Sequence, residues 1–422
     1  MKNSGVEWIG EIPEDWEVKP VKRYFSHVKR IVGDDVDKYE RLSLTMQGVL
    51  KRSKDDAEGL QPEKFNGYQI LKQNELVFKL IDLENVNTSR VGISPFNGLV
   101  SPAYIILSNN KKDNTFYYYW FLNMYYQEIF NKLGDGGVRS ALNASDVLSL
   151  PMVYLNNETQ QRIASYLDKK CNKIEETIQN QQQVIEKLKA YKQSLITEAV
   201  TGKVKIENGK ACGEYESYKD SGVEWIGKIP SEWDKIRIKW LLNERKERSE
   251  EGKEEPLSMS QKYGLIPTKE METIPNMAST FVGAKLTYKD DIVFNKLKAH
   301  LGVFSVSKYD GLVSPDYAVY TSTGKADLKY LEYLFKTPQC ISEFKKRSTG
   351  VGEGLTRLYT GELFSIYIPF PEKKTQKNIA NFLVSISTAI DTAIEQKQKL
   401  IEKLTEYKKS LIYECVTGKK EI

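Results

Sequence analysis

Two glycine-rich segments carry the residues best suited to contact a phosphate or a base. The first, residues 134–139 (GDGGVR), ends in Arg139, and the second, residues 350–357 (GVGEGLTR), ends in Arg357. Exposed backbone amides and a guanidinium group bind anionic oxygens, and an arginine can also pair with the edge of guanine. A surface loop with a solvated arginine would have the same sequence. Both interpretations remain open, and the repetition of this design in different surroundings is the argument for binding.

Further polar candidates follow short strand-like segments. Lys79 follows the apolar run 76–78, and a group of polar residues follows the matching run 292–294. Gln47 and Gln261 follow Leu-Ser-x-Thr/Ser segments, and a glutamine can pair with adenine. Any of these side chains could instead be an ordinary solvated group. By motif position and chemistry, the candidate nucleic-acid-binding residues are Arg139, Arg357, Lys79, Asn295, Lys296, Lys298, Gln47 and Gln261.

One pattern is compatible with catalysis. Pro315-Asp316 followed by Glu343-Phe344-Lys345 supplies two carboxylates and a lysine, which could hold Mg²⁺ for phosphodiester cleavage. However, Pro102-Ala103 stands at the matching place earlier in the chain, and Glu343 lies in a segment predicted to be helical. The phosphate-binding pattern G-x-x-x-x-G-K-[ST] does not occur. We therefore expect no catalytic residues, and a Mg-dependent nuclease is an alternative that the sequence disfavours.

The residues that usually bind transition metals are few and scattered. A zinc site needs clustered ligands, and no C-x-x-C pair is present. We expect no metal site and reduced thiols. The residues concerned are Cys171, Cys212, Cys340, Cys415, His27 and His300.

Internal repetition shows how these candidates are organised. The recurring motifs are SGVEWIG at 4–10 and 221–227, GLVSP at 98–102 and 311–315, and VTGK at 200–203 and 416–419. The closing segment of each copy matches the other without a gap, whereas the interiors agree only in patches. A unit of about 215 residues is far longer than a solenoid repeat. The repetition therefore predicts two domain-plus-helix modules with a constant frame and different interiors.

The closing segment of each module has the pattern of a long helix in a coiled coil. From Thr159 to about Val200 there is neither proline nor glycine, and apolar residues recur in alternating steps of three and four. About 42 residues at ~1.5 Å each make a helix of ~60 Å. The expected seam is Leu167, Ile174, Ile178, Ile185, Leu188 and Leu195 in the first helix, and Leu383, Ile390, Ile394, Ile401, Leu404 and Leu411 in the second.

A helix of this length needs a partner for its apolar stripe, and each helix is the obvious partner of the other. Antiparallel packing would place the preceding domains at opposite ends, related by a pseudo-twofold axis. Polar residues interrupt the seam at Gln181 and Lys397, near the helix midpoints, and at Lys192 and Lys408. An antiparallel pair brings Gln181 and Lys397 close together, where they could fix the register. The alternative is that each helix packs only on its own domain.

The expected fold class is α+β: two similar mixed α/β domains separated by a long antiparallel two-helix coiled coil, as a pseudo-twofold repeat. Residues 76–80, 104–107 and 366–368 are predicted strands, and 114–131 and 328–346 are predicted helices. The expected divisions are a first domain at 1–156, a spacer helix at 157–203, a linker at 204–220, a second domain at 221–372 and a second spacer helix at 373–422.

Composition bounds the function without identifying it. The formal net charge is +5, and the first domain comes to about −1 and the second to about +1. Charge alone therefore does not establish nucleic-acid binding. The chain has no apolar stretch long enough to span a membrane, and its start lacks the apolar run of a secretory signal. We expect a cytoplasmic protein.

The combination of motifs resembles the specificity subunits of type I restriction–modification enzymes. The resemblance rests on two divergent domains that are each followed by a near-identical long helix ending in V-T-G-K. The W-I-G-x-I-P segments, the G-L-V-S-P patches and Thr-Gln-x-x-Ile-Ala at each helix start support it. It covers essentially the whole chain, and the combination is specific although each short motif is weak.

The resemblance implies a non-catalytic protein in which each variable domain is a target recognition domain. Each domain would read one half of an asymmetric bipartite site in double-stranded DNA, and the coiled coil would space the domains and dock two methyltransferase (modification) subunits. Restriction/translocase subunits would join the assembly. No cofactor of its own is implied, because S-adenosylmethionine, ATP and Mg belong to those partners. Base-reading residues do not transfer between such variable domains.

A non-enzymatic coiled-coil scaffold with two protein-binding domains is the alternative of a different class. The near-neutral charge and the 11% aromatic content would permit it. Salt-dependent, sequence-selective DNA binding discriminates the two functions.

Overall fold

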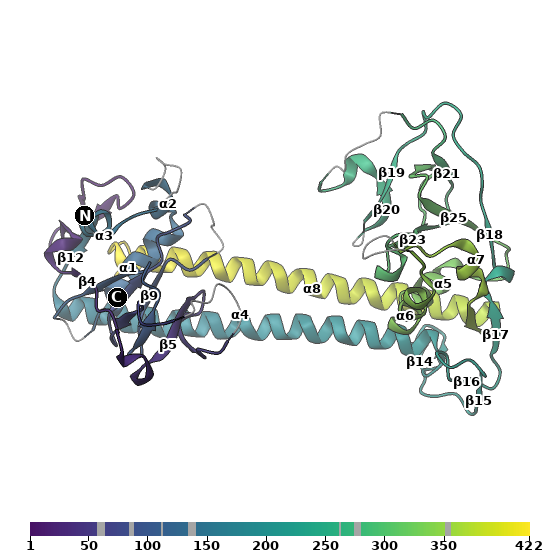
Figure 1. The fold of residues 1–422 in the computed structure, drawn as a ribbon, viewed down its shortest axis with the longest axis horizontal. Coiled ribbons are helices and arrows are strands. Elements are labelled where there is room, and N and C mark those ends of the chain that lie inside the picture. The colour runs from purple at the N-terminus through teal and green to yellow at the C-terminus, as the bar shows by residue number, and fades with distance from the viewer. Residues whose placement is uncertain are drawn as a thin grey trace. The chain divides into compact units, whose positions relative to one another are not determined.

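The computed structural model describes residues 1–56, 64–83, 88–110, 113–133, 141–260, 263–273, 280–350 and 356–422 (Figure 1). The chain forms two compact units. Unit 1 comprises Met1–Gln181 and Gln398–Ile422, and unit 2 comprises Gln182–Lys397. Each unit thus contains one part of each long helix, and the units are described separately.

Among the described residues, unit 1 has two four-stranded sheets, ordered β4-β11-β8-β9 and β6-β5-β10-β7, and the pairs β1-β2 and β12-β3. Its strands are β1 (Lys2–Asn3), β2 (Glu11–Ile12), β3 (Glu17–Pro20), β4 (Ser26–Val28), β5 (Glu40–Thr45), β6 (Gly48–Arg52), β7 (Gln69–Leu71), β8 (Leu76–Phe78), β9 (Val91–Ile93), β10 (Gly98–Val100), β11 (Ile105–Ser108) and β12 (Pro151–Tyr154).

Unit 2 repeats this arrangement in its described part. The sheet β18-β25-β22-β23 matches β4-β11-β8-β9, and a parallel bridge between Pro256 and Leu312 connects β19-β20 to β21-β24, as β5 runs parallel to β10 in unit 1. The strands are β13 (Ile206–Glu207), β14 (Lys210–Ala211), β15 (Tyr218–Asp220), β16 (Lys228–Pro230), β17 (Asp234–Arg237), β18 (Leu242–Glu244), β19 (Leu257–Ser260), β20 (Gly264–Pro267), β21 (Lys285–Thr287), β22 (Ile292–Asn295), β23 (Phe304–Val306), β24 (Gly311–Val313), β25 (Tyr317–Ser322) and β26 (Tyr367–Phe370).

Shorter helices cover the sheets. Unit 1 has α1 (Thr115–Tyr126), α2 (Ile129–Leu133) and α3 (Ala144–Ser149), and unit 2 has α5 (Leu328–Phe335), α6 (Pro338–Arg347) and α7 (Thr360–Ser365). The predicted α+β class with two similar domains is confirmed. Most of α1 is buried, including Tyr117, Trp120 and Phe121, because its sequence is apolar or aromatic on nearly every face. It therefore joins the core of unit 1 to both long helices.

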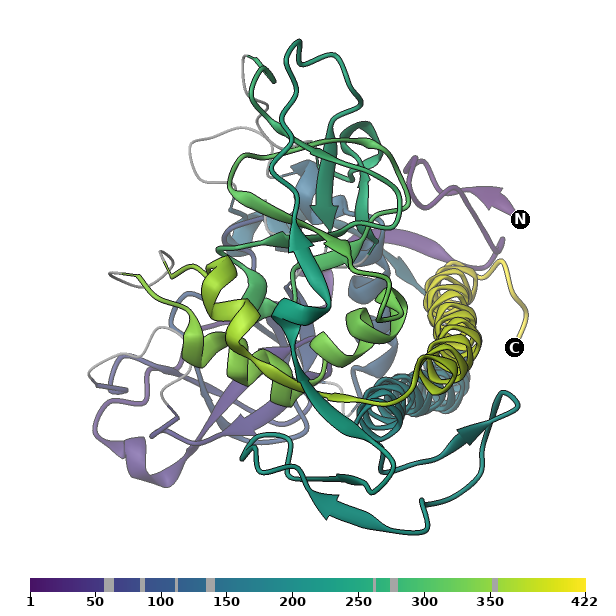
Figure 2. The same cartoon turned by 90° about the vertical axis from the view of Figure 1, so that its right-hand side faces the viewer.

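The long helices are α4 (Asn157–Val200) and α8 (Lys373–Val416), each of 44 residues. In unit 1 the beginning of α4 and the end of α8 share one apolar core that includes Leu167 and Leu411. In unit 2 the end of α4 and the beginning of α8 share another, with Ile196 and Leu383. The helices therefore pack together antiparallel within each unit, and Figure 2 shows them side by side nearly end-on. Each also packs on its neighbouring sheet domain.

The expected seam residues differ in burial. Leu167, Ile174, Ile185, Leu195, Leu383, Ile390 and Leu411 are buried, whereas Ile178, Leu188, Ile394, Ile401 and Leu404 are half-buried. The most deeply buried of them, Leu167, Leu383 and Leu411, belong to the cores that also contain the sheet domains. Burial along the helices is thus greatest where a domain covers the helix pair.

Two equivalent ion pairs join the helices. Lys192 Nζ lies 2.7 Å from Asp391 in unit 2, and Lys408 pairs with Glu175 in unit 1. The two lysines occupy the same position of the repeat, and so do the two carboxylates. The polar seam lysines are therefore paired with acidic residues of the facing helix. Gln181 and Lys397 fall on either side of the division between the units, and their approach stays a prediction.

The recurring opening and closing motifs contact one another. Gly202 and Gly418 both have left-handed φ angles, 78° and 73°, just after a long helix ends. An added Cβ on Gly418 would meet Pro13 at 2.5 Å and Trp16 at 3.2 Å, and one on Gly202 would meet Pro230 at 2.4 Å and Trp233 at 3.2 Å. The V-T-G-K motif and the I-P segment with its tryptophan are thus repeated together because they form one joint in each unit.

Candidate nucleic-acid interface

The G-L-V-S-P motif makes the turn from one sheet to the other in both units. In unit 1 the Tyr104 amide donates to the Ser101 carbonyl at 3.1 Å, and in unit 2 the Tyr317 amide donates to the Ser314 carbonyl at 2.9 Å. The serine hydroxyl accepts a bond from the amide two residues on in each case. We define the Ser-Pro edge of a unit as this turn, the first residue of β7 or β21, the last residue of β8 or β22, and the residues that follow that strand or lie beside its end.

These pieces lie together because of the strand pairing. Lys285 at the start of β21 faces Val313 at the end of β24, and Asn295 at the end of β22 faces Tyr317 at the start of β25. In unit 1, Gln69 faces Val100 and Phe78 faces Ile105 in the same way. One edge of each unit therefore combines segments that are far apart in the sequence.

The Ser-Pro edge of unit 1 is held by hydrogen bonds to backbone carbonyls and to a hydroxyl group. The Gln69 side chain is buried, and its Nε2 donates to the carbonyls of Ser101 at 3.1 Å and Tyr104 at 2.8 Å. Lys79 is half-buried, and its Nζ donates to Thr88 at 3.2 Å. The buried guanidinium of Arg90 donates to the carbonyls of residues 79, 81 and 82, which fixes the segment that follows β8.

The Ser-Pro edge of unit 2 gathers three of the predicted residues. The Leu358 amide donates to the Lys296 carbonyl at 3.1 Å, which places Arg357 beside the end of β22. Arg357 Nη2 lies 3.7 Å from Asp316 in the Ser-Pro turn. The Asn295 side chain accepts a bond from the Leu297 amide at 3.1 Å. The structure therefore brings Asn295, Lys296 and Arg357 together.

The remaining predicted residues lie elsewhere or outside the described part. Lys298 is exposed at the start of a short 3-10 helix, Ala299–Leu301, that follows β22. Gln47 lies in the turn between β5 and β6 and lines a cavity of about 350 Å³ with Tyr118, Tyr125 and Tyr126. The predictions for Arg139 and Gln261 lie outside the described residues.

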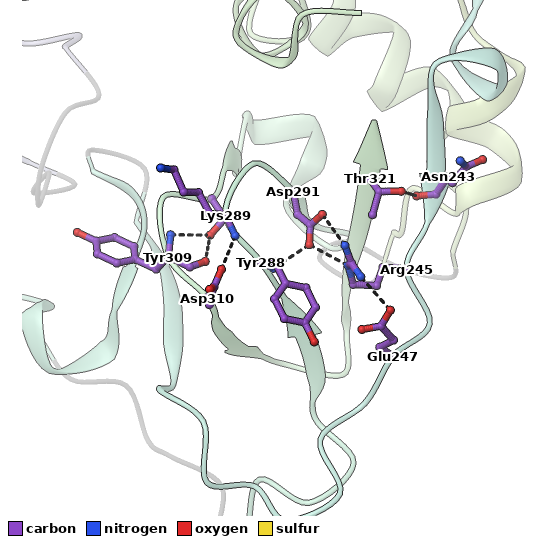
Figure 3. A network of polar contacts seen from close by, with 10 residues as sticks. Asn243, Arg245, Glu247, Tyr288, Lys289, Asp291, Tyr309, Asp310 and Thr321 are labelled. Carbon is purple, nitrogen blue, oxygen red and sulfur yellow. Dashed lines mark hydrogen bonds and ion pairs between the residues drawn. The ribbon is translucent and has the colours of Figure 1, made fainter. Parts of the chain in front are cut away.

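An arginine–carboxylate clamp, which the sequence did not reveal, supports the opposite end of the central strand in each unit. In unit 2 (Figure 3) Arg245 Nε lies 2.9 Å from Asp291, whose carboxylate also accepts the Tyr288 amide at 2.8 Å. In unit 1 Arg30 donates to both oxygens of Glu75 at 2.9 and 2.8 Å. The hydrogen bond to Asp291 raises the pKa of Arg245, and the one to Glu75 raises that of Arg30. Each carboxylate directly precedes β8 or β22, so the clamp fixes the strand that leads to the Ser-Pro edge.

The residues of the nuclease-like pattern have structural partners. Arg347 Nε donates to Glu343 at 2.7 Å within α6, and Asp316 pairs with Arg357. In the part of the chain that the structure describes, no three His, Cys, Asp or Glu side chains are grouped so as to hold a metal ion. None of the helices described there has an apolar stretch long enough to cross a membrane.

Comparison with known proteins identifies the family. Residues 52–187 and 230–404 match the family model "Type I restriction modification DNA specificity domain". A Methanocaldococcus jannaschii protein, named as the specificity subunit of the type I restriction enzyme MjaX, is 26% identical over 436 residues, covering 97% of this chain and 95% of that protein.

Solved structures show the same fold at low identity. A chain from a structure on complex assembly and conformational transition of the type I R-M system has a TM-score of 0.67 at 12% identity, covering 97% of this chain and 100% of that one. The HsdS subunit from Thermoanaerobacter tengcongensis has a TM-score of 0.52 at 13% identity, covering 97% and 98%. The family match spans both modules and confirms the resemblance seen in the motifs. The chain therefore belongs to the type I restriction–modification DNA specificity family and is a non-catalytic DNA specificity subunit, in a class of enzymes whose cofactors reside on the partner subunits.

Proposed function

We propose that each unit reads one half of a bipartite site in double-stranded DNA, with its Ser-Pro edge as part of the contact surface. One observation carries this proposal. The same backbone turn forms the edge in both units, but the side chains at equivalent positions of the edge differ. A constant frame with variable side chains suits two readers of different sequences. Half-sites on one face of B-DNA lie about one helical turn, ~34 Å, apart, or multiples of it.

The two half-sites are expected to differ, because equivalent positions of the two edges carry different chemistry. Gln69 of β7 corresponds to Lys285 of β21, and Ala103 of the first turn corresponds to Asp316 of the second. An amide and an ammonium group have different donors and acceptors, and a carboxylate adds an acceptor that alanine lacks. An asymmetric site is the natural target of such a pair.

We further propose that the long helices dock two methyltransferase subunits. Val184 and Tyr191 are exposed on α4, and Leu400 and Tyr407 are exposed at the same repeat positions on α8. Exposed apolar residues at one helical spacing are typical of a protein-binding stripe. Because the two stripes are equivalent, two copies of one partner suit them. Restriction/translocase subunits would join this assembly, which would act in the cytoplasm on the cell's DNA and supply the S-adenosylmethionine, ATP and Mg sites.

Methylation mapping tests the proposal. The full chain is co-expressed with candidate methyltransferase subunits, and adenine methylation is mapped by single-molecule sequencing. We expect one split motif with two unlike halves and a fixed gap. A stable complex that methylates without sequence preference would instead favour the scaffold function.

A domain exchange provides the sharper test. Replacing residues 17–155 with the corresponding segment of a relative of different specificity should change one half of the motif and leave the other unchanged. A replacement that alters both halves would contradict the assignment of one half-site to each unit.

A further inference from the structure

Lys285 is a buried cation at the Ser-Pro edge of unit 2. Its side chain is 9% exposed, and its Nζ lies 3.8 Å from Glu244 Oε1, which is too long for a hydrogen bond. Within the described residues, this ion pair is the one polar contact of the ammonium group. An ammonium group has three donors, and burying it with a single distant carboxylate leaves its charge poorly compensated.

Other cations surround it. An isolated β-bridge pairs Arg248 with Lys285, and Lys296 lies at the adjoining end of β22. Burial and then the nearby charge of Lys296 lower the pKa of Lys285, while Glu244 and Asp316 act in the opposite direction. Asp316 is shared with Arg357. Among the described side chains linked by these contacts, the cations are Lys285, Lys296, Arg248 and Arg357, and the carboxylates are Glu244 and Asp316.

Unit 1 shows that the edge folds without a cation at this position. Gln69 occupies the equivalent place, and its amide donates to the two carbonyls of the Ser101–Tyr104 turn. Its role is to hold the turn. The charge of Lys285 is therefore not required by the shared backbone design, although it carries the desolvation cost that burial imposes on an ammonium group.

We propose that Lys285, together with Lys296, binds a backbone phosphate of the DNA in the half-site read by unit 2. This inference rests on the proposed contact of the Ser-Pro edge with DNA. A phosphate supplies the missing negative charge and several acceptor oxygens, and lysine binds it as a point charge. The exposed Ser314 and Asp316 place this cluster at the surface of the unit. Unit 1 lacks the contact, so the two half-sites depend unequally on salt.

Lys285→Gln in the full chain, assembled with its methyltransferase subunits, tests the proposal on a duplex that carries the mapped motif. Glutamine is the matched choice because Gln69 shows that it fits the same frame. Log affinity falls as log salt rises, and losing one phosphate contact should make this dependence shallower, with a slope less negative by about 0.9. With the affinities of wild type and variant equal at about 1 M salt, where this electrostatic contribution vanishes, the variant should bind about 15-fold more weakly at 50 mM salt and about fourfold more weakly at 200 mM. The recognised motif should be unchanged. Lys253→Gln, at an exposed lysine paired with Glu251, controls for the loss of one surface charge and should leave the slope unaltered.

Phosphate neutralisation locates the contact. Single methylphosphonate substitutions are scanned through the half-site of unit 2, and one of them should weaken binding by the wild-type complex but not further weaken binding by the Lys285→Gln complex. A variant with an unchanged salt slope would overturn the proposal, and so would a variant with altered base preference, which would mark Lys285 as a base reader. Both of these outcomes would overturn only the phosphate contact of Lys285. If the complex still methylates a well-defined split motif, the proposed function stands. A wild-type complex that methylates no split motif would remove that function itself.

Discussion

The joint between Gly418 and Pro13 tests how unit 1 is closed. Alanine at residue 418 would have to adopt a φ of 73°, and the left-handed conformation costs a non-glycine residue about 1–2 kcal/mol. The new Cβ would lie 2.5 Å from two ring carbons of Pro13 and 3.2 Å from the buried Trp16. A rigid proline ring and a buried indole cannot move away independently, so overpacking adds about 1–3 kcal/mol. We expect Gly418→Ala to destabilise the joint by about 2–5 kcal/mol.

The matched control is Gly5→Ala in the same unit. Gly5 has a φ of 76°, and no atom lies within 4 Å of the position that its Cβ would occupy. This variant therefore has the backbone strain alone, about 1–2 kcal/mol. The difference between the two variants isolates the packing of the V-T-G-K turn on the I-P segment.

Hydrogen exchange measures that difference under conditions where unit 1 opens as a whole, so that the strain of either variant counts equally. The amides of Thr417 and Lys419, which donate to the carbonyls of Tyr413 and Glu414, report opening of the joint. Their protection should fall roughly five- to 150-fold further in Gly418→Ala than in Gly5→Ala, as 1–3 kcal/mol requires. Equal protection in the two variants would refute the view that this contact closes unit 1.

Two further predictions concern the long helices and the thiols. A double-mutant cycle of Lys192→Met and Asp391→Asn should give a coupling of about 0.2–1 kcal/mol that declines with salt, because the pair is partly exposed, and a coupling above ~2 kcal/mol would contradict this assignment. Burial raises the pKa of Cys171 to about 11 and that of Cys415 to about 12, and it also raises the pKa of Cys340, whereas Cys212 is exposed. A raised pKa keeps a thiol protonated, and therefore unreactive, until the pH approaches that pKa. A thiol reagent at pH 8 should therefore modify Cys212 rapidly and the three buried cysteines only on unfolding. Fast modification of a second thiol in the folded protein would contradict this prediction.

Sequence patterns correctly predicted the elements that have a local periodicity, above all the two long helices. Heptad spacing and the absence of helix breakers predict long helices, and α4 and α8 extend over those segments. The predicted helix at 328–346 is two helices, because Thr337 caps α6 and Pro338 begins it. The predicted helix at 114–131 is also interrupted, at Glu128, whose φ is 57°. Thr337-Pro338 was a readable signal for a break, whereas Glu128 offers none.

The candidate site depended more on tertiary pairing. Lys285 and Gln69 are different residue types in segments without a common motif. Their positions are recognised as equivalent only from the pairing of β21 with β24 and of β7 with β10. Arg245 and Asp291 of the clamp are separated by 46 residues in the sequence. Helix and strand periodicities relate residues only a few positions apart, so they could not predict this contact. Asn295, Lys296 and Arg357 were proposed from their positions after repeated motifs, but their proximity depends on the Leu358–Lys296 hydrogen bond and the Arg357–Asp316 ion pair. Their contact with DNA stays a prediction.

The division of the chain has a consequence for synthesis on the ribosome. Unit 2 is one continuous run, 182–397, whereas unit 1 takes its final piece, 398–422, from more than two hundred residues after Gln181. At roughly 5–20 residues per second, translation of the intervening segment lasts roughly 10 to 40 seconds. During that interval the residues of unit 1 that pack on α8, including Cys171 and Ile174, lack their apolar contacts with Leu411 and Cys415. The first domain to emerge is therefore the last to be completed, and a nascent chain of this protein exposes the surface on which its own final helical turns will close.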